Sequence, residues 1–374
     1  MAMRNFDAIV IGGGLVGTAV AYGLAKQRLT TVLLDEGDVA HRASRGNFGL
    51  VWVQSKGLGA PHYQRWTRNS ATAWPALAAE FATAGFDVGL HQPGGIHICL
   101  SPKEFEARGV YMARLQQEAG NFGLEYRMLN AAEIRDHLPG VGPIVAGGSL
   151  SPYDGHASPL HLLRALHSQF TALGGIYVPG ATVTDTRAAP HDFTATVGHA
   201  SYNAPRMVLA AGLGNAALAP LFGLSAPVHP ERGEILVTER TTAVLPMPTT
   251  SLRQTDEGSV MIGDSKEDAG YDSLRQSPAI MRTMAQRAVL SFPWIAELNI
   301  VRAWSALRIM SPDGLPIYDQ SSRFPGAFVA NCHSGVTLAG AHANILAPMI
   351  AAGALSAELA PFTAERFAHV RNAA

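Results

Sequence analysis

The sequence predicts an α/β fold that contains a unit built on a parallel sheet. Three features of the amino-terminal segment support this prediction. Residues 6–11 form a short apolar run of the kind found in buried parallel strands. From Leu15 onward, small and apolar residues suit a closely packed helix. Residues 30–34 form a second apolar run, which ends at Asp35 and Glu36, and strand, helix and strand in this order are typical of a parallel sheet.

The glycines between the first strand and the helix have the spacing Gly12-x-Gly14-x-x-Gly17. In a Rossmann-like dinucleotide site the first glycine makes a tight turn, the second lets a pyrophosphate approach the backbone, and the third lets helix and sheet pack closely. The phosphates then lie at the helix N-terminus, next to Leu15 and Val16. Asp35 is the better candidate to accept hydrogen bonds from a ribose, and Glu36 is the second. The alternative interpretation is that these are two solvated acids in a turn.

Composition limits the classes of function. The 374 residues include 28 Lys and Arg against 29 Asp and Glu, and charged residues make up 15% of the chain. A basic nucleic-acid-binding surface is therefore not expected. With 47% hydrophobic residues the chain is expected to fold compactly, and its length predicts two domains. The two cysteines, Cys99 and Cys332, cannot form a disulfide framework or a CxxC pair, and no His-Glu-x-x-His motif is present, so we predict no metal site.

One charge-free stretch, residues 8–25, has the length of a membrane span. The glycine cluster interrupts it, and no cleavage site of small residues is obvious after it. Apolar segments within residues 339–360 carry His342, Asn344 and Glu358, which would be costly in hydrocarbon. We predict no integral membrane span and a cytoplasmic location, with peripheral membrane association through a complex as a further option.

These motifs resemble the D-amino-acid oxidase-like (DAO) FAD-dependent oxidoreductases, and the resemblance covers nearly the whole chain. It is carried by FDAIVIGGGLVGTAVAYGLA, VLLDEGD and the run RGNFGLVWVQSKG. Within the family the chain is most similar to glycine oxidase and to the flavin subunits of opine oxidase and D-hydroxyproline dehydrogenase. The resemblance implies a glutathione-reductase/D-amino-acid-oxidase type FAD-binding domain and a substrate domain on a mixed sheet. It also places a segment beside the flavin that contains Ser44, Arg45, Gly46, Asn47 and Gly49. Arg45 could equally be a surface charge.

Further segments match the family along the chain. The turn at residues 154–159 resembles the family's DGHxxP, where a purely structural role is the favoured interpretation for His156. The apolar run 207–211, closed by Gly212, resembles a second backbone approach to the cofactor, which implies Ala211 and Gly212 as cofactor-binding residues. Val183 is a further predicted cofactor-binding residue. Residues 230–234, PERGE, resemble the return into the substrate domain. We therefore predict a discontinuous FAD-binding domain of residues 1–86, 148–224 and 302–374, with a substrate domain of residues 87–147 and 225–301.

The carboxyl-terminal third carries the segments most relevant to chemistry. Residues 304–316 resemble the family's WxGLRP and DGxP stretch, in which an arginine binds the substrate carboxylate. Arg308 is that residue here, and a planar guanidinium can take a carboxylate bidentately. A structural ion pair is the alternative role for Arg308. Residues 331–340 resemble the family's last flavin motif, in which the backbone-binding candidates are Gly335, Val336, Thr337 and Leu338. His333 either lines the active site or only hydrogen-bonds a carbonyl.

The resemblance implies oxidation of the C–N bond of an α-amino or N-substituted amino acid, by hydride transfer to flavin N5 and hydrolysis of the imine. Non-covalent FAD is expected, since residues 305–311 contain no cysteine at the place where sarcosine oxidases attach flavin. Met261 stands where those oxidases have a lysine that helps oxygen react. Arg308, His333 and Tyr271 are the predicted catalytic residues. The polar candidates for the pocket wall are Tyr271, Tyr153, Lys56 and His333.

Members of this family differ in the acceptor to which the reduced flavin passes its electrons. The flavin subunits of opine and hydroxyproline dehydrogenases work with partner redox subunits, and we expect this chain to do the same. An additional FMN or iron–sulfur centre is expected only with such partners. The alternatives are a stand-alone oxidase that forms hydrogen peroxide, a non-catalytic flavin electron-relay subunit, and a nicotinamide-linked reductase, for which no second nucleotide fingerprint is found.

Overall fold

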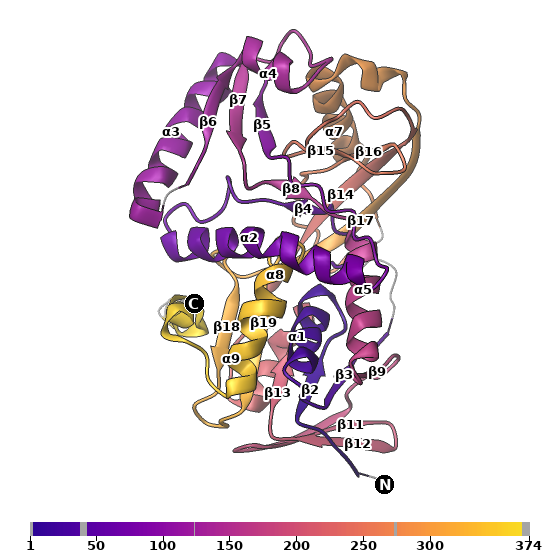
Figure 1. Cartoon of the computed structure of the whole chain (residues 1–374), viewed down its shortest axis with the longest axis vertical. Helices are drawn as coiled ribbons and strands as arrows, with labels where there is room; N and C mark the ends of the chain where they lie inside the picture. The colour runs from indigo at the N-terminus through magenta and orange to yellow at the C-terminus, as the bar shows by residue number, and fades with distance from the viewer. Residues whose placement is uncertain (1–2, 38–42, 123, 273–274, 369–374) are drawn as a thin grey trace.

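The computed structural model of the chain describes residues 3–37, 43–122, 124–272 and 275–368, and its largest sheet has six strands (Figure 1). In spatial order they are β18 (Ile317–Gln320), β19 (Ala327–Asn331), β13 (Met207–Leu209), β2 (Ala8–Ile11), β3 (Thr31–Leu34) and β9 (Ile176–Val178). The strands from β19 to β9 are parallel, and β18 pairs antiparallel with β19. The carboxyl ends of β19, β13, β2 and β3 therefore meet at one edge, where open α/β sheets bind ligands.

Both faces of this sheet are buried, because successive strand residues alternate between two apolar clusters. On β2, Ala8 and Val10 belong to the cluster on the helical face, whereas Ile9 and Ile11 belong to the cluster on the opposite face. The helical face packs against α1 (Leu15–Lys26), α5 (Pro159–Ala172) and the carboxyl-terminal helices. The opposite face is covered by a four-stranded sheet of β1 (Met3–Asn5), β12 (Ala200–Ala204), β11 (Asp192–Val197) and β10 (Asp185–Ala189). This burial explains why β2 and β3 are continuous apolar runs.

Two smaller antiparallel sheets form the other part of the molecule, at the top of Figure 1. One consists of β5 (Gly95–Cys99), β7 (Gly147–Ser151) and β6 (Arg127–Asn130), with α3 (Pro102–Ala119) and α4 (Ala131–His137) beside it. The other consists of β15 (Leu252–Gln254), β16 (Ser259–Ile262), β14 (His229–Arg240) and β17 (Ile300–Met310), with α7 (Pro278–Ser291). An isolated parallel bridge joins Ile96 of β5 to Thr249, just before β15, and side chains of the two sheets share one apolar cluster.

The long helix α2 (Pro61–Thr83) crosses between these two parts in Figure 1. It holds the turn before the carboxyl-terminal helices, because Ser70 Oγ donates to Thr337 O at 2.7 Å and Trp74 Nε1 donates to Val336 O at 3.0 Å. Those helices are α8 (Ala339–Ala341), a π-helical turn (His342–Leu346) and α9 (Ala347–Ala352). The remaining pair of strands is β4 (Leu50–Val51) and β8 (Gly155–His156). Short helices occur at α6 (Asn215–Leu218) and, in 3-10 form, at Gly120–Phe122, Gly212–Gly214, Ala219–Phe222, Pro293–Glu297, Ala357–Phe362 and Ala364–Phe367.

The strands and helix expected near the amino terminus are present as β2, β3 and α1, and the run at 207–211 contains β13. The helix expected near Leu160 begins one residue earlier, at Pro159. The predicted domain border at 147–148 falls within β7, and the border at 301–302 falls within β17. The division into two domains stays a prediction.

Within the described ranges, no single helix combines the length and the apolar character needed to cross a membrane. One bent pair, Ala339–Ala352 with Ala357–Phe367, meets the length and composition test only when its two helices are taken together.

Candidate functional site

A cavity of about 810 Å³ lies at the carboxyl ends of the parallel strands. Such a volume is within the usual range for small-molecule and cofactor sites. Its wall includes thirteen of the predicted cofactor-binding residues, which are Gly12, Gly14, Leu15, Val16, Asp35, Glu36, Ser44, Arg45, Asn47, Val183, Ala211, Gly212 and Gly335. These residues come from six separate segments of the chain, and the sheet edge brings them together.

The turn between β2 and α1 depends on its glycines. Gly12 has φ +110°, a conformation that side chains rarely adopt, and an added Cβ would clash with Ala210 O. An added Cβ on Gly14 would lie 2.8 Å from Ser44 Oγ, so this glycine keeps the helix N-terminus open. Gly17 is buried away from the cavity, and its Cβ would clash with Gly12 O. Gly17 therefore acts through packing, as expected for the third glycine of the motif.

Asp35 closes this turn from the end of β3. Its Oδ2 accepts the Gly13 N–H at 2.6 Å, and its Oδ1 accepts the Gly37 N–H at 3.0 Å. The carboxylate is thus fixed at the cavity wall, where it can also accept a bond from a ligand hydroxyl. Glu36 lines the same cavity.

His167, on α5, is a cavity residue that the sequence did not reveal. Its Nε2 lies 3.1 Å from Gly13 O and 3.2 Å from Thr18 Oγ1, and burial lowers its pKa, so the ring is neutral. Donation from Nε2–H to Gly13 O leaves Nδ1 as an acceptor, and this buried atom has no hydrogen-bond partner among the described residues. A buried acceptor without a partner at a cavity wall fits a site that is completed by a ligand. No local motif marks His167, because α5 reaches the glycine turn only through tertiary packing.

The loop before β4 reaches both this cavity and a neighbouring one. Ser44 Oγ accepts the Leu15 N–H at 2.9 Å, at the first turn of α1. Ser44 and Arg45 line the first cavity, Gly46 lines the second, and Asn47 lines both. Gly49 lines neither, because it forms a turn with φ +95° whose N–H bonds to Asn47 Oδ1. Its place is behind the loop, so the structure does not bring Gly49 to the predicted site.

The second cavity has a volume of about 290 Å³ and lies between the β14–β17 sheet and the loop after β19. Asn47, Leu307 and His333 line both cavities, so the two adjoin. Val336 and Thr337 line the second cavity, whereas Leu338 is fully buried and lines neither. The ionisable residues that line the second cavity are Lys56, Glu231, Glu234, Asp264, Lys266, Arg308 and His333.

Arg308 lies opposite Glu231 on the neighbouring strand, and its Nη1 is 3.1 Å from Glu231 Oε1. About a quarter of each side chain is exposed. The guanidinium lies over Gly233, where an added Cβ would come within 2.8 Å of Arg308 Cζ. Arg308 therefore forms an ion pair, which was the alternative to the predicted carboxylate-binding role. It also lines the second cavity, where a substrate could reach it.

Lys56 and His333 meet at the inner end of the second cavity. Lys56 Nζ lies 3.1 Å from His333 Nε2 and donates to Ser334 Oγ at 3.0 Å. Burial, together with the nearby Arg308 and Lys266 charges, lowers the pKa of Lys56 to about 8. Burial and the Lys56 charge hold the pKa of His333 well below its usual value. His333 also has a backbone hydrogen bond with Gly314, so both roles considered for this ring are present in its geometry.

The segment that carries Lys56 is fixed at two points. Thr337 Oγ1 accepts the Trp52 N–H at 3.2 Å and donates to Leu50 O at 3.0 Å. Asp154, in the predicted 154–159 turn, accepts the Val53 N–H at 2.5 Å. The turn thus has a structural role that positions the cavity wall.

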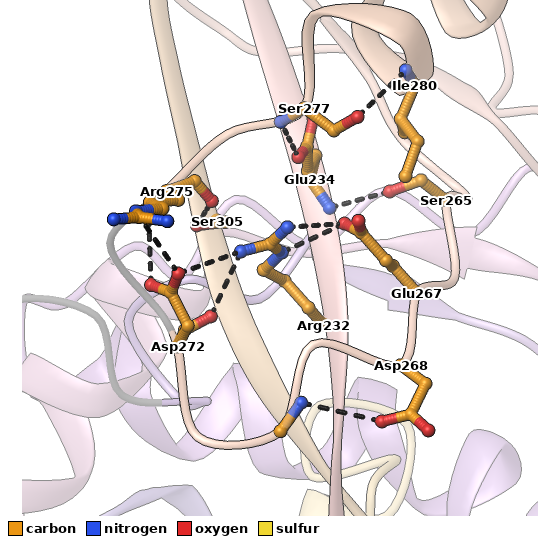
Figure 2. A network of polar contacts seen from close by, with 11 residues as sticks. Arg232, Glu234, Ser265, Glu267, Asp268, Asp272, Arg275, Ser277, Ile280 and Ser305 are labelled. Carbon is orange, nitrogen blue, oxygen red and sulfur yellow. Dashed lines mark hydrogen bonds and ion pairs between the residues drawn. The ribbon is translucent and has the colours of Figure 1, made fainter.

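A polar network behind β14 fixes the chain that follows β16 (Figure 2). Successive side chains of a strand alternate between its faces, so Arg232 lies on the face opposite to Glu231. Its Nη2 lies 2.6 Å from Glu267 Oε2. Its Nη1 donates to Asp272 O at 3.2 Å. Glu234, on the same face, accepts the Ser277 N–H at 2.6 Å. This network positions Asp264 and Lys266 at the rim of the second cavity.

Two predicted pocket residues lie elsewhere. Tyr271 lines neither cavity and is 70% exposed, because it belongs to the surface loop held by Arg232. Tyr153 also lines neither cavity, and its hydroxyl accepts a bond from Arg68 Nη2 at 2.6 Å. The expectation that either residue lines the pocket is corrected accordingly.

The described residues contain no group of three or more His, Cys, Asp or Glu side chains that could hold a metal ion. Cys99 and Cys332 are buried and unpaired with each other.

Comparison with known proteins identifies the family. The family model DAO, described as FAD dependent oxidoreductase, matches residues 7–349. An opine oxidase subunit of Agrobacterium tumefaciens (strain Ach5) is 43% identical over 366 residues, which cover 98% of each chain. Glycine oxidase of Geobacillus kaustophilus (strain HTA426) is 26% identical and covers 97% of each chain. The crystal structure of glycine oxidase from Geobacillus kaustophilus superposes with a TM-score of 0.87, covering 96% of this chain and 98% of the other. The predicted fold class is confirmed, and the chain belongs to the DAO family of FAD-dependent oxidoreductases.

Proposed function

We propose that the chain oxidises the C–N bond of an α-amino or N-substituted amino acid, with an opine as the first candidate substrate. The observation that carries this proposal is the junction of the two cavities. A cavity with dinucleotide-binding features adjoins a smaller one that contains Arg308, and His333 lines both. An arginine held there would fix a substrate carboxylate at a set distance from the reacting group of the cofactor.

The residues of the first cavity fit FAD. The open N-terminus of α1 is a site for a pyrophosphate, and the fixed Asp35 carboxylate is a site for a ribose. His167 Nδ1, which has no partner among the described residues, can accept a bond from a donor of the cofactor. Ser44, Arg45 and Asn47 supply further donors on the wall of the first cavity, and Asn47 also lines the second. FAD bound there would supply the hydride acceptor.

The second cavity fits an anionic amine. The Arg308 guanidinium carries five N–H donors, and Glu231 engages Nη1, so further donors remain for a substrate carboxylate. Lys266 adds positive charge to the same wall, against the acids Glu231 and Asp264. The 43% identical relative is named as part of an opine oxidase, and this name supports an opine as substrate.

We further propose that the chain works in a heteromeric complex, because the same relative is named as one subunit of its enzyme. Partner subunits would then accept the electrons, through an additional FMN or iron–sulfur centre that they carry. The 26% identity with glycine oxidase favours a second candidate, a stand-alone oxidase that forms hydrogen peroxide.

An anaerobic bleaching experiment tests the proposed function. The FAD-loaded protein is mixed without oxygen with glycine, sarcosine, D- and L-proline, D-hydroxyproline and an opine, and the visible flavin absorbance is followed. We expect at least one N-substituted amino acid to bleach the flavin, and NADH to leave it unchanged. Failure of every amine would contradict the proposal.

Reoxidation of the bleached protein then distinguishes the two candidates. An electron-accepting dye should reoxidise the flavin much faster than oxygen does if the chain is part of a heteromeric dehydrogenase. Formation of hydrogen peroxide at a rate comparable to dye reduction would instead establish the stand-alone oxidase.

A further inference from the structure

Lys56 lines the second cavity beside its junction with the first, because it contacts a residue that lines both. Its Nζ contacts His333 Nε2 at 3.1 Å, and His333 lines both cavities. The described residues include no carboxylate within ion-pair distance of Nζ. A partly buried lysine without an acidic partner is costly for a structural role, because its ammonium loses water without gaining an ion pair.

The hydrogen bonds around Lys56 leave one site open when the amine is neutral. Ser334 Oγ accepts one N–H, at 3.0 Å. The bond between His333 and the Gly314 backbone is assigned to Nδ1–H, which makes Nε2 an acceptor that Lys56 Nζ and Ser334 Oγ share, each at 3.1 Å. The lone pair of Nζ then has no partner among the described residues and is available to the contents of the cavity.

We propose that Lys56 accepts the proton that the substrate amine must lose before its α C–H bond is cleaved. This inference rests on the proposed function. An amino acid enters as its ammonium form, which has no lone pair to support the departure of hydride. One N–H bond of the substrate breaks, an Nζ–H bond forms on Lys56, and the substrate nitrogen keeps the electron pair. Hydride loss to the cofactor then leaves an iminium, and Lys56 returns its proton to water in the cavity.

The groups around Lys56 suit this proton transfer at neutral to mildly alkaline pH. Arg308 and Lys266 oppose the charged form of Lys56, and they outweigh the favourable effect of Asp264. Glu231, across the cavity, is engaged by Arg308. Cys332 and the Tyr63 hydroxyl, which donates to Ser334 Oγ, are held neutral by burial, which raises the pKa of Cys332 to about 12. A pKa of about 8 for Lys56 keeps a large share of the amine neutral near its working pH.

Lys266 lines the same cavity but differs from Lys56 in position. It is exposed at the rim, and its Nζ makes no hydrogen bond or ion pair with the described residues. Lys266 can attract an anionic substrate through its charge, but it does not contact His333. Comparing variants of Lys56 and Lys266 therefore distinguishes a role in proton transfer from a role in electrostatic attraction.

The test is the limiting rate of anaerobic flavin reduction, measured by rapid mixing as a function of pH with the amine that bleaches the wild type fastest. The wild-type rate should rise with pH and level off above about pH 8. Lys56→Met should reduce the plateau rate at least about 100-fold and abolish the rise, which is the usual effect of losing a general base. Lys56→Arg should stay equally slow, because arginine keeps the charge but does not release a proton in this range. Lys266→Met should keep the pH-dependent rise.

A second measurement tests the acid–base property itself. In the FAD-loaded wild type, the rate of Lys56 acetylation by acetic anhydride should have its pH midpoint near 8, whereas a free lysine derivative in the same solution should have a midpoint near the ordinary lysine value of about 10.4. FAD content and thermal unfolding of each variant show whether it is folded.

Two results would overturn the inference separately from the proposed function. A Lys56→Arg variant that reduces flavin as fast as the wild type would show that only the charge matters. A Lys56→Met variant that is slow but keeps the wild-type pH rise would show that another group takes the proton. If no amine bleaches the wild type, the proposed function fails, and this inference fails with it.

Discussion

At the residue scale, Arg308 combines an ion pair with unused hydrogen-bonding capacity. Glu231 holds the guanidinium through Nη1 at 3.1 Å, and this contact fixes its position over Gly233. The ion pair thus orients the guanidinium before substrate arrives, which lowers the entropy cost of binding.

Removing the Arg308 charge should impair substrate use. We expect Arg308→Met to lower kcat/KM by roughly 30-fold to several thousand-fold, as for other losses of one member of a close charge pair, worth about 2–5 kcal/mol. Arg308→Lys should recover only part of this loss, because an ammonium cannot bind a carboxylate bidentately. Arg302→Met, on the same strand and exposed, is the matched control. Unchanged kcat/KM in Arg308→Met would place the substrate carboxylate elsewhere.

The contributions of Asp35 and Glu36 to FAD binding can be measured separately. Asp35 accepts two backbone N–H bonds and is fixed at the wall of the first cavity. Asp35→Ala should therefore weaken FAD binding by about 10- to 100-fold, the value of one or two charge-assisted hydrogen bonds. Glu36→Ala, its sequence neighbour in the same cavity, should have a smaller effect. FAD release into buffer, followed by its fluorescence, gives both dissociation constants, and a larger effect at Glu36 would reverse the assignment.

At the element scale, the packing of α1 on the sheet determines the shape of the phosphate end of the first cavity. Gly17 lets the first turn of α1 approach the Gly12 carbonyl, and Gly23 lets the same helix approach the Ala343 carbonyl. Close approach at both points keeps the helix N-terminus at the edge of the parallel strands.

A pair of glycine substitutions tests this packing. Gly17→Ala should destabilise the protein by several kcal/mol and abolish FAD retention, because backbone atoms cannot move away from the added methyl group. Gly109 lies within α3, and a Cβ added there would lie 3.9 Å from Met128 Cε, its nearest neighbour. Gly109→Ala should therefore stabilise the protein by about 0.5–1 kcal/mol. Urea unfolding of both variants gives the comparison. A Gly17→Ala protein with wild-type stability and FAD content would contradict the close approach.

At the scale of the whole molecule, Asp154 links the two parts of the fold. It belongs to the turn between β7 and β8, and it anchors the Val53 N–H of the segment that lines the second cavity. The side chain is fully buried, its Oδ2 has no partner among the described residues, and burial raises its pKa to about 7.

This raised pKa predicts a pH dependence of stability. The folded state favours the neutral carboxyl, so stability falls as pH rises from the ordinary aspartate pKa of about 3.8 through about 7. Relative to Asp154→Asn, whose side chain does not titrate, the wild type should lose about 2–3 kcal/mol of unfolding free energy between pH 5 and pH 8. Urea unfolding of both proteins at the two pH values measures this change. A constant difference between them would show that the pKa of Asp154 is the same in the folded and unfolded states.

The parts predicted well from sequence are those that local geometry dictates. The run from β2 through the glycine turn to α1 was predicted because a tight turn, a close helix and a buried strand each require particular residue types in consecutive positions. The loop at Ser44–Asn47 and the Arg308 strand were found through family resemblance, and both line the cavities.

The polar residues of the second cavity were not resolved from sequence. Four candidates were equivalent in the sequence, yet Lys56 and His333 line the cavity, while Tyr153 and Tyr271 lie outside it. Their side chains are all polar and isolated in the chain, so no periodicity distinguishes them. His167 was not predicted for the same reason, since its contact with Gly13 joins positions 154 residues apart.

The sequence by itself determined the dinucleotide-binding unit and the family, because the turn, the strand and the acid after it are contiguous and their physical requirements are local. Only the tertiary structure decided which side chains face the substrate cavity. Register between β14 and β17 places Glu231 opposite Arg308, and the folding of residues 50–56 against the loop after β19 brings Lys56 to His333. Such contacts depend on how distant segments pack, and a side chain's identity does not specify its distant neighbour.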